Sequence, residues 1–148
     1  MSLVIYHKKR KFAKTPEPRG AVASKGKDRF VVQEHHASHL HWDFRLELDG
    51  VLKSWAVPKG APEKSGTKHL AVQVEDHPTP YLNFHGTIPK GQYGAGTVKI
   101  WDKGTFKLLE RTPHAIKVLL KGKRLKGIFV LFKFQAKNWL LFKANKPA

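Results

Sequence analysis

The stretch HHASHLHWDFRLELDGVLKSWAV, residues 35–57, contains the signals that decide the fold. Side chains two residues apart share a face of an extended strand, so the alternation within residues 39–48 separates a polar row from an apolar row. The dipeptide Asp49-Gly50 is typical of a two-residue hairpin turn, because both positions need a positive φ that glycine adopts freely and aspartate tolerates. These signals predict two antiparallel strands joined by a tight turn.

The expected turn fixes which side chains face each other across the two strands. On one face the polar row meets small residues, which leaves open space above it. On the other face aromatic and β-branched side chains pair and stabilise the sheet by packing. The pairs expected from this register are Leu48–Val51, Arg45–Ser54, Phe44–Trp55, Asp43–Ala56 and Trp42–Val57.

Strand signals continue through the chain from Arg29 onward. Short apolar or alternating runs are separated by Asp-Gly, Lys-Gly and Pro-Lys-Gly turns, and no long stretch keeps a 3.6-residue period. This pattern predicts an all-β sandwich or barrel, and the basic composition favours a single antiparallel β-barrel with a usable face or cavity. The runs expected to form strands are RFVVQ, HWDFRLEL, VLKSWAV, HLAVQVEDH, GTVKIW, TFKLL, AIKVLL, GIFVLFKF and WLLFKA.

The N-terminal segment differs from the rest of the chain. It is rich in Lys, Pro, Gly and small residues and has no sustained period. We expect a basic arm over residues 1–28, followed by one β-barrel domain over residues 29–148. Phe12, Arg10 and Glu17 offer groups that can dock the arm against the barrel. The alternative is a disordered tail without a role.

The composition excludes several classes of protein. A hydrophobic fraction of 41%, with nine Phe and four Trp, is too high for a disordered chain despite a net charge of +17. The absence of cysteine excludes disulfides and thiolate zinc sites, so His, carboxylate or water must hold any metal. No signal peptide or bilayer-spanning stretch is evident, which predicts a cytoplasmic, nucleoid-associated protein. A polybasic membrane-surface role is the minor alternative.

The excess of positive charge indicates a polyanionic partner, because such a chain repels itself in the compact state. Eight Lys or Arg precede Asp28 against one acid, and twelve follow from Lys103 onward against Glu110 alone. Nine of the eleven acids and seven of the nine His lie between these flanks. Basic flanks around such a centre predict a nucleic-acid-binding surface that frames a site, and a generically basic soluble protein is the alternative.

The polar row contains residue types that bind metals and phosphates. His35 lies six residues before His41, where a bend can bring the two imidazoles together near Asp43. Two imidazoles and a carboxylate suit a divalent cation with open positions, manganese in a six-coordinate site or zinc in a four-coordinate one. A solvated sheet face is the alternative, and position alone excludes no histidine of the stretch. The row comprises His39, His41, Asp43, Arg45 and Glu47.

The run HLAVQVEDH, residues 69–77, repeats this alternation. It offers Glu75 and His77 to converge with the first strand across a cavity. A neutral core histidine with one hydrogen bond is the alternative for His77. The face expected to carry these two residues comprises His69, Ala71, Gln73, Glu75 and His77, and the opposite face comprises Leu70, Val72 and Val74.

Two further features carry weaker signals. The stretch GTIPKGQYGAGTV, residues 86–98, is a glycine-rich loop that does not match a P-loop, so we expect a structural role. Lys59 lies just past the second hairpin strand, where it can reach back to a phosphate. A solvated lysine is the alternative.

Longer motifs resemble one known family. The run RFVVQEHHASHLHWDFRLELDGVLKSWAVPKGAP, followed by VEDHP, FHGTIPKGQYGAGTV and IWDKGTF, resembles the 3′-phosphoesterase domain of bacterial and archaeal ATP-dependent DNA ligase D. This domain also occurs as a free-standing protein, which is the version expected here. The resemblance extends from about Arg10 to Phe106. It implies an eight-stranded β-barrel with a polar, crater-like active site and a manganese-dependent enzyme, with zinc or another divalent cation as alternatives.

The resemblance also implies a reaction and a set of residues. In this family a phosphodiesterase step removes the terminal nucleoside from a 3′ ribonucleotide end, and a phosphomonoesterase step removes the remaining 3′-phosphate to leave a 3′-OH. DNA 3′ ends are then the substrate, in non-homologous end joining, with separate ligase or polymerase repair partners. The metal ligands carry over to His35, His41 and Asp43, the catalytic set to Arg45, Lys59, Glu75, His77 and Tyr81, and the substrate-binding set to Arg10, Glu17, Arg45, Lys59 and His69.

Four positions depart from the family pattern. Lys11 stands where the family often has an acid, and His69 stands where an arginine is common. Trp42 replaces the usual Tyr, and His85 replaces the Glu of a usual FEG motif. These changes leave the metal residues intact but affect arm docking and the clamping of the scissile phosphate. We therefore expect a lower phosphodiesterase than phosphomonoesterase activity.

The expected mechanism assigns a role to each part of the site. The cation acts as a Lewis acid on a phosphate oxygen, while Arg45 with Lys59 clamps the other oxygens. His77 contacts the phosphate or transfers a proton to the leaving oxygen, and Glu75 orients a ligand, arginine or water. The alternative is a non-catalytic nucleic-acid-binding β-barrel with a structural metal site, which predicts binding without turnover. A hydrolase of small phosphorylated metabolites leaves the charge of +17 unexplained.

Overall fold

The computed structural model describes residues 3–20 and 27–144 of the chain. Most of these residues lie in strands, and the helices are short. The elements are α1 (Val4–Lys8), η1 (Phe12–Lys14), β1 (Arg29–His36), β2 (Leu40–Leu48), β3 (Val51–Val57), β4 (Lys68–His77), η2 (Thr79–Asn83), β5 (Gly86–Ile88), β6 (Gly96–Thr112), β7 (Ala115–Lys121), β8 (Lys126–Gln135) and β9 (Asn138–Lys143).

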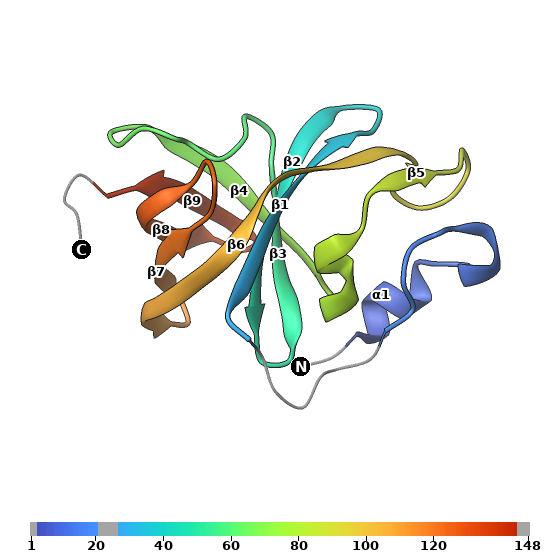
Figure 1. The fold of residues 1–148 in the computed structure, drawn as a ribbon, viewed down its shortest axis with the longest axis horizontal. Helices are drawn as coiled ribbons and strands as arrows, with labels where there is room; N and C mark the ends of the chain where they lie inside the picture. The colour runs from blue at the N-terminus through green and yellow to red at the C-terminus, as the bar shows by residue number, and fades with distance from the viewer. Residues whose placement is uncertain (1–2, 21–26, 145–148) are drawn as a thin grey trace.

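Eight strands close into an antiparallel barrel. The hydrogen-bonded order is β1-β2-β3-β4-β9-β8-β7-β6, and β1 also pairs with β6, which completes the ring. The short strand β5 pairs with the first residues of β6 as a ninth strand outside the ring. Figure 1 shows α1 and β5 together on one side of this barrel. The prediction of a single antiparallel β-barrel of about eight strands with few helices is confirmed.

The β2–β3 hairpin has the predicted register. Leu48 pairs with Val51 and Arg45 with Ser54, and the three other expected pairs are also present. Asp49 has φ 57° and Gly50 has φ 77°, the left-handed conformation that the turn requires. The local signal in the sequence was therefore sufficient to fix this pair of strands.

The predicted strands GTVKIW and TFKLL are one strand, β6, so their separation by a turn was wrong. Asp102 is 4% exposed, and its carboxylate accepts hydrogen bonds from backbone N–H groups. A Cβ added to Gly104 would lie 2.2 Å from the carbonyl oxygen of Lys121 on β7. Asp102 and Gly104 are residue types common in turns, but here they allow β6 to contact the neighbouring backbone.

Two apolar clusters lie on opposite faces of the β1–β3 sheet. The first fills the barrel interior and includes Phe44, Leu46 and Trp55. The second lies on the outer face, where Val31 and Leu52 pack beneath side chains from α1, η2 and β5. The polar row of β2 shares this outer face, so the N-terminal arm and η2 cover it.

A β-bulge in β4 changes which side chains share a face. The pairing of β3 with β4 shifts register between Leu52 and Ser54, where β4 contains one more residue than β3. As a result, Ala71 packs inside the barrel, whereas Glu75 and His77 reach the outer face. The prediction that these three side chains share one face is therefore wrong, because strict alternation does not continue through the bulge.

Candidate active site

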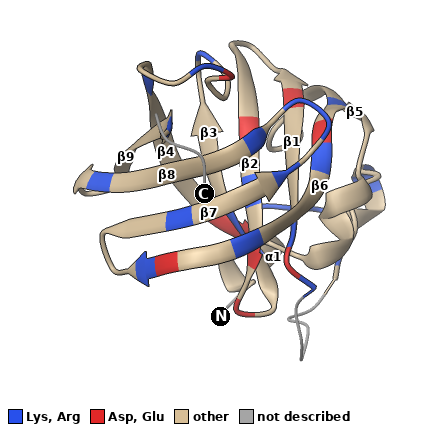
Figure 2. Cartoon of the chain, turned by 60° about the vertical axis from the view of Figure 1, so that its left-hand side comes forward, with Lys and Arg blue, Asp and Glu red and all other residues tan. Residues whose placement is uncertain are grey.

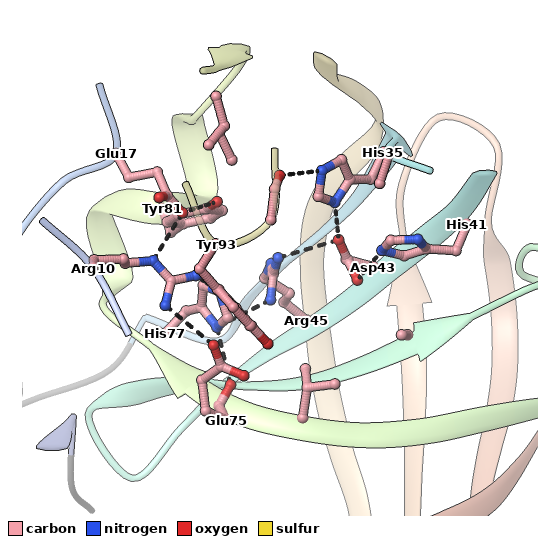
Figure 3. Close-up of a pocket in the computed structure, with 15 residues that line it drawn as sticks. Arg10, Glu17, His35, His41, Asp43, Arg45, Glu75, His77, Tyr81 and Tyr93 are labelled. Atoms are coloured by element: carbon pink, nitrogen blue, oxygen red, sulfur yellow. Dashed lines mark hydrogen bonds and ion pairs between the residues drawn. The ribbon is translucent and has the colours of Figure 1, made fainter. Parts of the chain in front are cut away.

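A polar pocket lies on the outer face of the barrel, between strands β1–β4 and the elements that cover them (Figure 3). Nine of the eleven site residues expected from the sequence line it. The small side chain opposite Asp43 lines it as well, as the hairpin register predicted. The lining residues are Arg10, Glu17, His35, Ala37, His41, Asp43, Arg45, Ala56, Val74, Glu75, His77, Tyr81, Ile88, Tyr93 and Gly94.

Three of these side chains form a group that can hold a metal ion. His35 Nδ1 lies 3.5 Å from Asp43 Oδ2, and His41 Nε2 lies 3.2 Å from Asp43 Oδ1. One ligand atom from each residue lies within 4.8 Å of the others. The bend after β1 that the sequence suggested exists, because His35 pairs directly with His41 across β1 and β2.

The second nitrogen of each imidazole supports a metal site. His35 Nε2 lies 2.8 Å from the carbonyl oxygen of Gly94, and His41 Nδ1 lies 3.1 Å from the carbonyl oxygen of His39. A carbonyl only accepts hydrogen bonds, so each of these outer nitrogens donates, and the inner nitrogen that faces Asp43 is the one positioned to ligate a metal ion. Metal-ligating histidines are oriented in this way. The donor set therefore fits a divalent cation.

The charge of Asp43 is held by its neighbours. Burial by itself would raise the pKa of this carboxyl group, but the positive charge of Arg45 and hydrogen bonds from His35 and His41 lower it far below its usual range. Asp43 is therefore ionised at neutral pH. An ionised carboxylate between two imidazoles is the charged ligand that a cation requires.

Arg45 is 3% exposed and is fixed on several sides. Its Nε donates to the side-chain oxygen of Gln33 at 2.7 Å, and Nη2 lies 3.4 Å from Asp43 Oδ2. Nη1 lies 3.2 Å from Nδ1 of His77, and the guanidinium lies over the ring of Tyr81 at 4.9 Å. A planar cation thus borders the metal-binding group, in a position to bind oxygens of a phosphate held there.

His77 is held as a neutral imidazole. Burial lowers its pKa well below the usual value, and the nearby charges of Arg45 and Arg10 lower it further. Its Nδ1 lies 2.9 Å from the carbonyl oxygen of Glu75, and its Nε2 lies 3.3 Å from Nη2 of Arg10. Both contacts are satisfied when Nδ1–H donates to the carbonyl and Nε2 accepts from the arginine.

The N-terminal arm closes one wall of the pocket through Arg10. This side chain donates from Nε to Glu17 Oε2 at 2.9 Å and from Nη1 to Glu75 Oε2 at 3.1 Å (Figure 3). The Tyr81 hydroxyl donates to the same Glu17 oxygen at 2.7 Å. All three charged side chains are at most 4% exposed. The arm is therefore docked on β4 and η2 by a buried network of charged groups.

Comparison with known proteins identifies the family. The family model described as the DNA ligase D 3′-phosphoesterase domain matches residues 33–133, which is more than half of the chain. The chain belongs to the DNA ligase D 3′-phosphoesterase domain family. The match covers the strands that carry the metal-binding group, Arg45 and His77.

Several proteins named LigD are similar to this 3′-phosphoesterase domain. The multifunctional non-homologous end joining protein LigD of Mycolicibacterium smegmatis is 46% identical over 151 residues, which cover 93% of this chain and 20% of that protein. LigD of Mycobacterium tuberculosis H37Rv is 46% identical over 145 residues, with 93% and 19% covered. LigD of Pseudomonas aeruginosa is 46% identical over 155 residues, with 97% and 18% covered. The chain spans about a fifth of the length of the curated relatives it matches.

Two of the expected site residues do not line the pocket of this 3′-phosphoesterase domain. Lys59 is exposed in the turn after β3. His69 lies near the start of β4, where its Nδ1 contacts the carbonyl oxygen of Gly60 at 2.5 Å. The structure therefore brings neither residue to the metal-binding group.

The other polar residues of the opening stretch also lie outside the pocket. His36 is exposed and pairs with Glu34, and His39 is exposed and contacts the carbonyl oxygen of Ser38. Glu47, expected on the polar row, is buried and forms hydrogen bonds with the Arg29 side chain at 2.9 and 2.8 Å. Of the four histidines in this stretch, only His35 and His41 belong to the candidate metal site.

Sequence reasoning missed three groups that shape the site. Gln33 accepts a hydrogen bond from Arg45 and lies two residues before His35 on β1. Residues two apart share a face of a strand, so this spacing could have assigned Gln33 to the face of His35. Tyr93 lines the pocket and accepts a hydrogen bond from the Lys9 ammonium at 3.2 Å. Tyr93 and the carbonyl of Gly94 come from the glycine-rich loop, whose placement depends on pairing of β5 with β6.

The described residues contain no helix long and apolar enough to cross a membrane. Their longest α-helix is α1, which has five residues.

Proposed function

We propose that the chain is a metal-dependent phosphoesterase that heals DNA 3′ ends. It would remove a 3′-phosphate as a phosphomonoesterase and a 3′-terminal ribonucleoside as a phosphodiesterase, leaving a 3′-OH for repair. The single observation that supports this proposal is the convergence of His35, His41 and Asp43 beside the Arg45 guanidinium in one pocket (Figure 3). Membership of the 3′-phosphoesterase domain family supports the same substrate class.

The metal site is assigned to His35, His41 and Asp43, with manganese as the proposed ion and zinc or another divalent cation as alternatives. A bound divalent cation supplies Lewis-acid polarisation of a phosphate oxygen. The carbonyl contacts of both imidazoles hold their inner nitrogens toward Asp43. The chain would thereby present two imidazole nitrogens and one carboxylate oxygen to the ion.

Arg45 is the proposed clamp for the phosphate. Its guanidinium is held by Gln33, so its remaining N–H groups keep one direction. A fixed planar fork binds phosphate oxygens in pairs and stabilises the charge that develops during hydrolysis. Lys59 is exposed in the turn after β3 and does not line the pocket. We therefore propose that it approaches the phosphate only when the substrate is bound.

His77 is the proposed proton donor to the leaving oxygen. It is neutral in the free pocket because burial and two arginines lower its pKa. A phosphate bound beside it places negative charge nearby, which favours the protonated imidazole. Substrate binding would therefore load His77 with the proton that the leaving oxygen takes up, which is the 3′ oxygen of the strand in the monoesterase step and the 5′ oxygen of the nucleoside in the diesterase step. Glu75 and Tyr81 would position this step through Arg10 and Glu17.

The net charge of +17 supports DNA as the partner and association with the nucleoid in the cytoplasm. The relatives are named for non-homologous end joining, which supports a role at broken ends. Ligase and polymerase activities would then come from separate proteins or from other parts of a larger one. His69 would contribute to substrate binding from outside the pocket.

The decisive experiment measures inorganic phosphate released from a 3′-phosphorylated DNA strand with manganese present. The wild-type protein is expected to release phosphate, and His41→Ala is expected to abolish the release. His36→Ala is the matched control, because this exposed imidazole lies on β1 but outside the pocket. If the wild-type protein binds such ends but leaves them intact with every divalent cation tried, it is a non-catalytic DNA-binding barrel.

A further inference from the structure

A second site lies outside the polar pocket, at the middle of β6 and the loop that joins β7 to β8. Figure 2 shows Lys and Arg along β6, β7 and β8 and on this loop. Six residues line one hollow there, which we call the basic hollow. They are Ile100, Trp101, Asp102, Lys103, Lys123 and Arg124.

The backbone of the basic hollow is held rigidly by one carboxylate. Oδ1 of Asp102 accepts from the backbone N–H of Lys103 and of Lys123, each at 2.9 Å. Oδ2 accepts from the backbone N–H of Arg124 at 3.2 Å and of Leu125 at 2.8 Å. Both oxygens of this buried group are therefore occupied by the loop, which keeps a single conformation.

Close packing also fixes this loop. A Cβ added to Gly122 would lie 2.4 Å from Oδ2 of Asp102 and 2.7 Å from the ring of Phe30. The loop can approach the end of the barrel only because this position is glycine. Trp101 is the extra residue of a bulge, since Val32 and Gln33 of β1 pair with residues two apart on β6. The close approach at Gly122 and the bulge at Trp101 therefore shape the basic hollow.

The cations of the basic hollow have no acidic partner among the described residues. Lys123 and Arg124 are exposed and form no ion pair in residues 3–20 and 27–144. Asp102 does not pair with them because backbone N–H groups occupy its oxygens. The Arg124 guanidinium stacks over the Trp101 ring at 4.5 Å, which restricts its orientation. The Lys103 ammonium donates to the side-chain oxygen of Asn83 on η2.

We propose that the basic hollow binds backbone phosphates of the DNA strand whose 3′ end occupies the polar pocket. This inference rests on the proposed function, because it assigns the segment of substrate that precedes the reacting end. Two cations without acidic partners among the described residues, one of them a guanidinium oriented by Trp101, match phosphodiester oxygens. Base edges have no dedicated partner there, so the contact positions the strand without reading its sequence.

Both sites lie along the same two elements. η2 carries Tyr81 of the polar pocket and Asn83, which contacts Lys103 of the basic hollow. On β6, Val98 pairs with His35, and Lys103 follows five positions later, a distance of roughly 16 Å. That separation corresponds to about five nucleotides of a duplex strand. A substrate shorter than this reaches the polar pocket but not the basic hollow.

The test measures binding of a labelled DNA duplex of about 12 base pairs with 3′-OH ends, in chelator and without metal, over a range of salt concentrations. The double variant Lys123→Ala/Arg124→Ala is expected to reduce the slope of log affinity against log salt by about 1.8, because each lost phosphate contact accounts for about 0.9. The matched control is Lys107→Ala/Lys117→Ala, which removes the same charge from β6 and β7 outside the hollow and is expected to keep the wild-type slope. Equal slopes for the two double variants would overturn the proposal.

A second measurement separates this inference from the proposed function. The KM for phosphate release is compared between a 3′-phosphorylated strand of about 12 nucleotides and a 3′-phosphorylated dinucleotide. The Lys123→Ala/Arg124→Ala variant is expected to raise the KM of the long strand toward that of the dinucleotide, with kcat unchanged. An unchanged KM for the long strand would contradict the proposal that the basic hollow binds the substrate strand. If the wild-type protein releases no phosphate from either substrate, the proposed function fails. The binding test still decides whether the basic hollow binds DNA.

Discussion

The side-chain oxygen of Gln33 accepts a hydrogen bond at 2.7 Å from Nε of Arg45, which lines the polar pocket. The amide nitrogen of Gln33 donates to the carbonyl oxygens of Tyr81 and Phe84, at 2.8 and 3.0 Å. One fully buried amide thus joins β1, β2 and the segment around η2. It orients Arg45, the proposed phosphate clamp, and ties the backbone of Tyr81 and Phe84 to β1.

Replacing Gln33 with Leu is expected to lower kcat by about 10- to 100-fold, because a small displacement of a positioned group has that effect. Manganese affinity is expected to stay close to wild type, since the side-chain amide of Gln33 bonds to Arg45, Tyr81 and Phe84 and not to the proposed metal ligands. The loss of donors to two buried carbonyls lowers the free energy of unfolding by about 1–3 kcal/mol. Phosphate release, manganese titration and urea unfolding measure the three effects.

The variant Gln33→Glu provides the matched comparison. Its carboxylate can still accept from Arg45 but cannot donate to Tyr81 or Phe84. We expect it to recover part of the kcat while keeping the loss of stability. If Gln33→Leu loses stability but retains the wild-type kcat, Gln33 has only a structural role.

Metal affinity is expected to depend on pH through His41. A hydrogen bond to Asp43 raises the pKa of this imidazole, so protons compete with the ion more strongly than at an isolated histidine. Affinity therefore rises with pH until His41 is neutral and falls on the acid side, by up to about tenfold per pH unit. Manganese titrations at about pH 8 and about pH 6 check this dependence. The control His36→Ala is expected to show the same dependence, and a dissociation constant independent of pH would contradict it.

Stability is expected to depend on pH through His77. Its pKa in the folded protein lies well below the value of about 6.5 in an unfolded chain. Below that pH the unfolded chain takes up a proton that the folded protein does not, so the free energy of unfolding falls as pH falls. The contribution approaches about 1.4 kcal/mol per pH unit. Urea unfolding is measured in chelator at several pH values for wild type and His77→Asn. The difference between the two proteins isolates the contribution of His77 to the pH dependence of the free energy of unfolding.

The exposed histidine His114 supplies the control for this measurement. His114→Asn is expected to keep the wild-type dependence of stability on pH, whereas His77→Asn loses the part due to the buried imidazole. Parallel curves for wild type and His77→Asn would mean that His77 takes up its proton equally in the folded protein and in the unfolded chain.

The parts of the fold that sequence predicted best are those set by neighbours in the chain. The β2–β3 hairpin depends on alternation and on Asp49-Gly50, which act within a few residues. The bulge in β4 depends on how that strand meets β3, and no local pattern marks it. For this reason the sequence brought Glu75 and His77 to the pocket that they line, while the face assigned to Ala71 was wrong.

In the candidate site, too, features set by neighbours in the chain could be predicted, whereas features set by the tertiary fold could not. His41, Asp43 and Arg45 share a strand face, and His35 meets them through the next strand, so period two was enough to group them. The carbonyl of Gly94 that orients His35 comes from a distant loop and has no residue-type signal. Side-chain chemistry can be predicted from residue types, whereas backbone groups that support it require the tertiary fold.

The arm is expected to control the phosphodiesterase step more than the phosphomonoesterase step. Arg10 holds Glu17 and Glu75 and accounts for much of the docking of the arm. In the proposed mechanism a terminal phosphate needs only the metal site and Arg45, whereas a diester also carries a nucleoside that has to be positioned against the pocket wall. Arg10→Ala is therefore expected to lower phosphodiesterase activity by about 10- to 100-fold and phosphomonoesterase activity by less than tenfold.

The neighbouring exposed residue makes the matched control. Lys11→Ala changes the same amount of charge but leaves the buried network intact, so we expect both activities to stay near wild type. Proteolysis within the arm is expected to accelerate in Arg10→Ala and not in Lys11→Ala, because undocking lets Glu17 regain water. Arg10→Lys keeps the charge but cannot reach Glu17, Glu75 and His77 together, so it should not rescue the diesterase. Equal losses of both activities in Arg10→Ala would show that the arm supports the metal site itself rather than the leaving nucleoside.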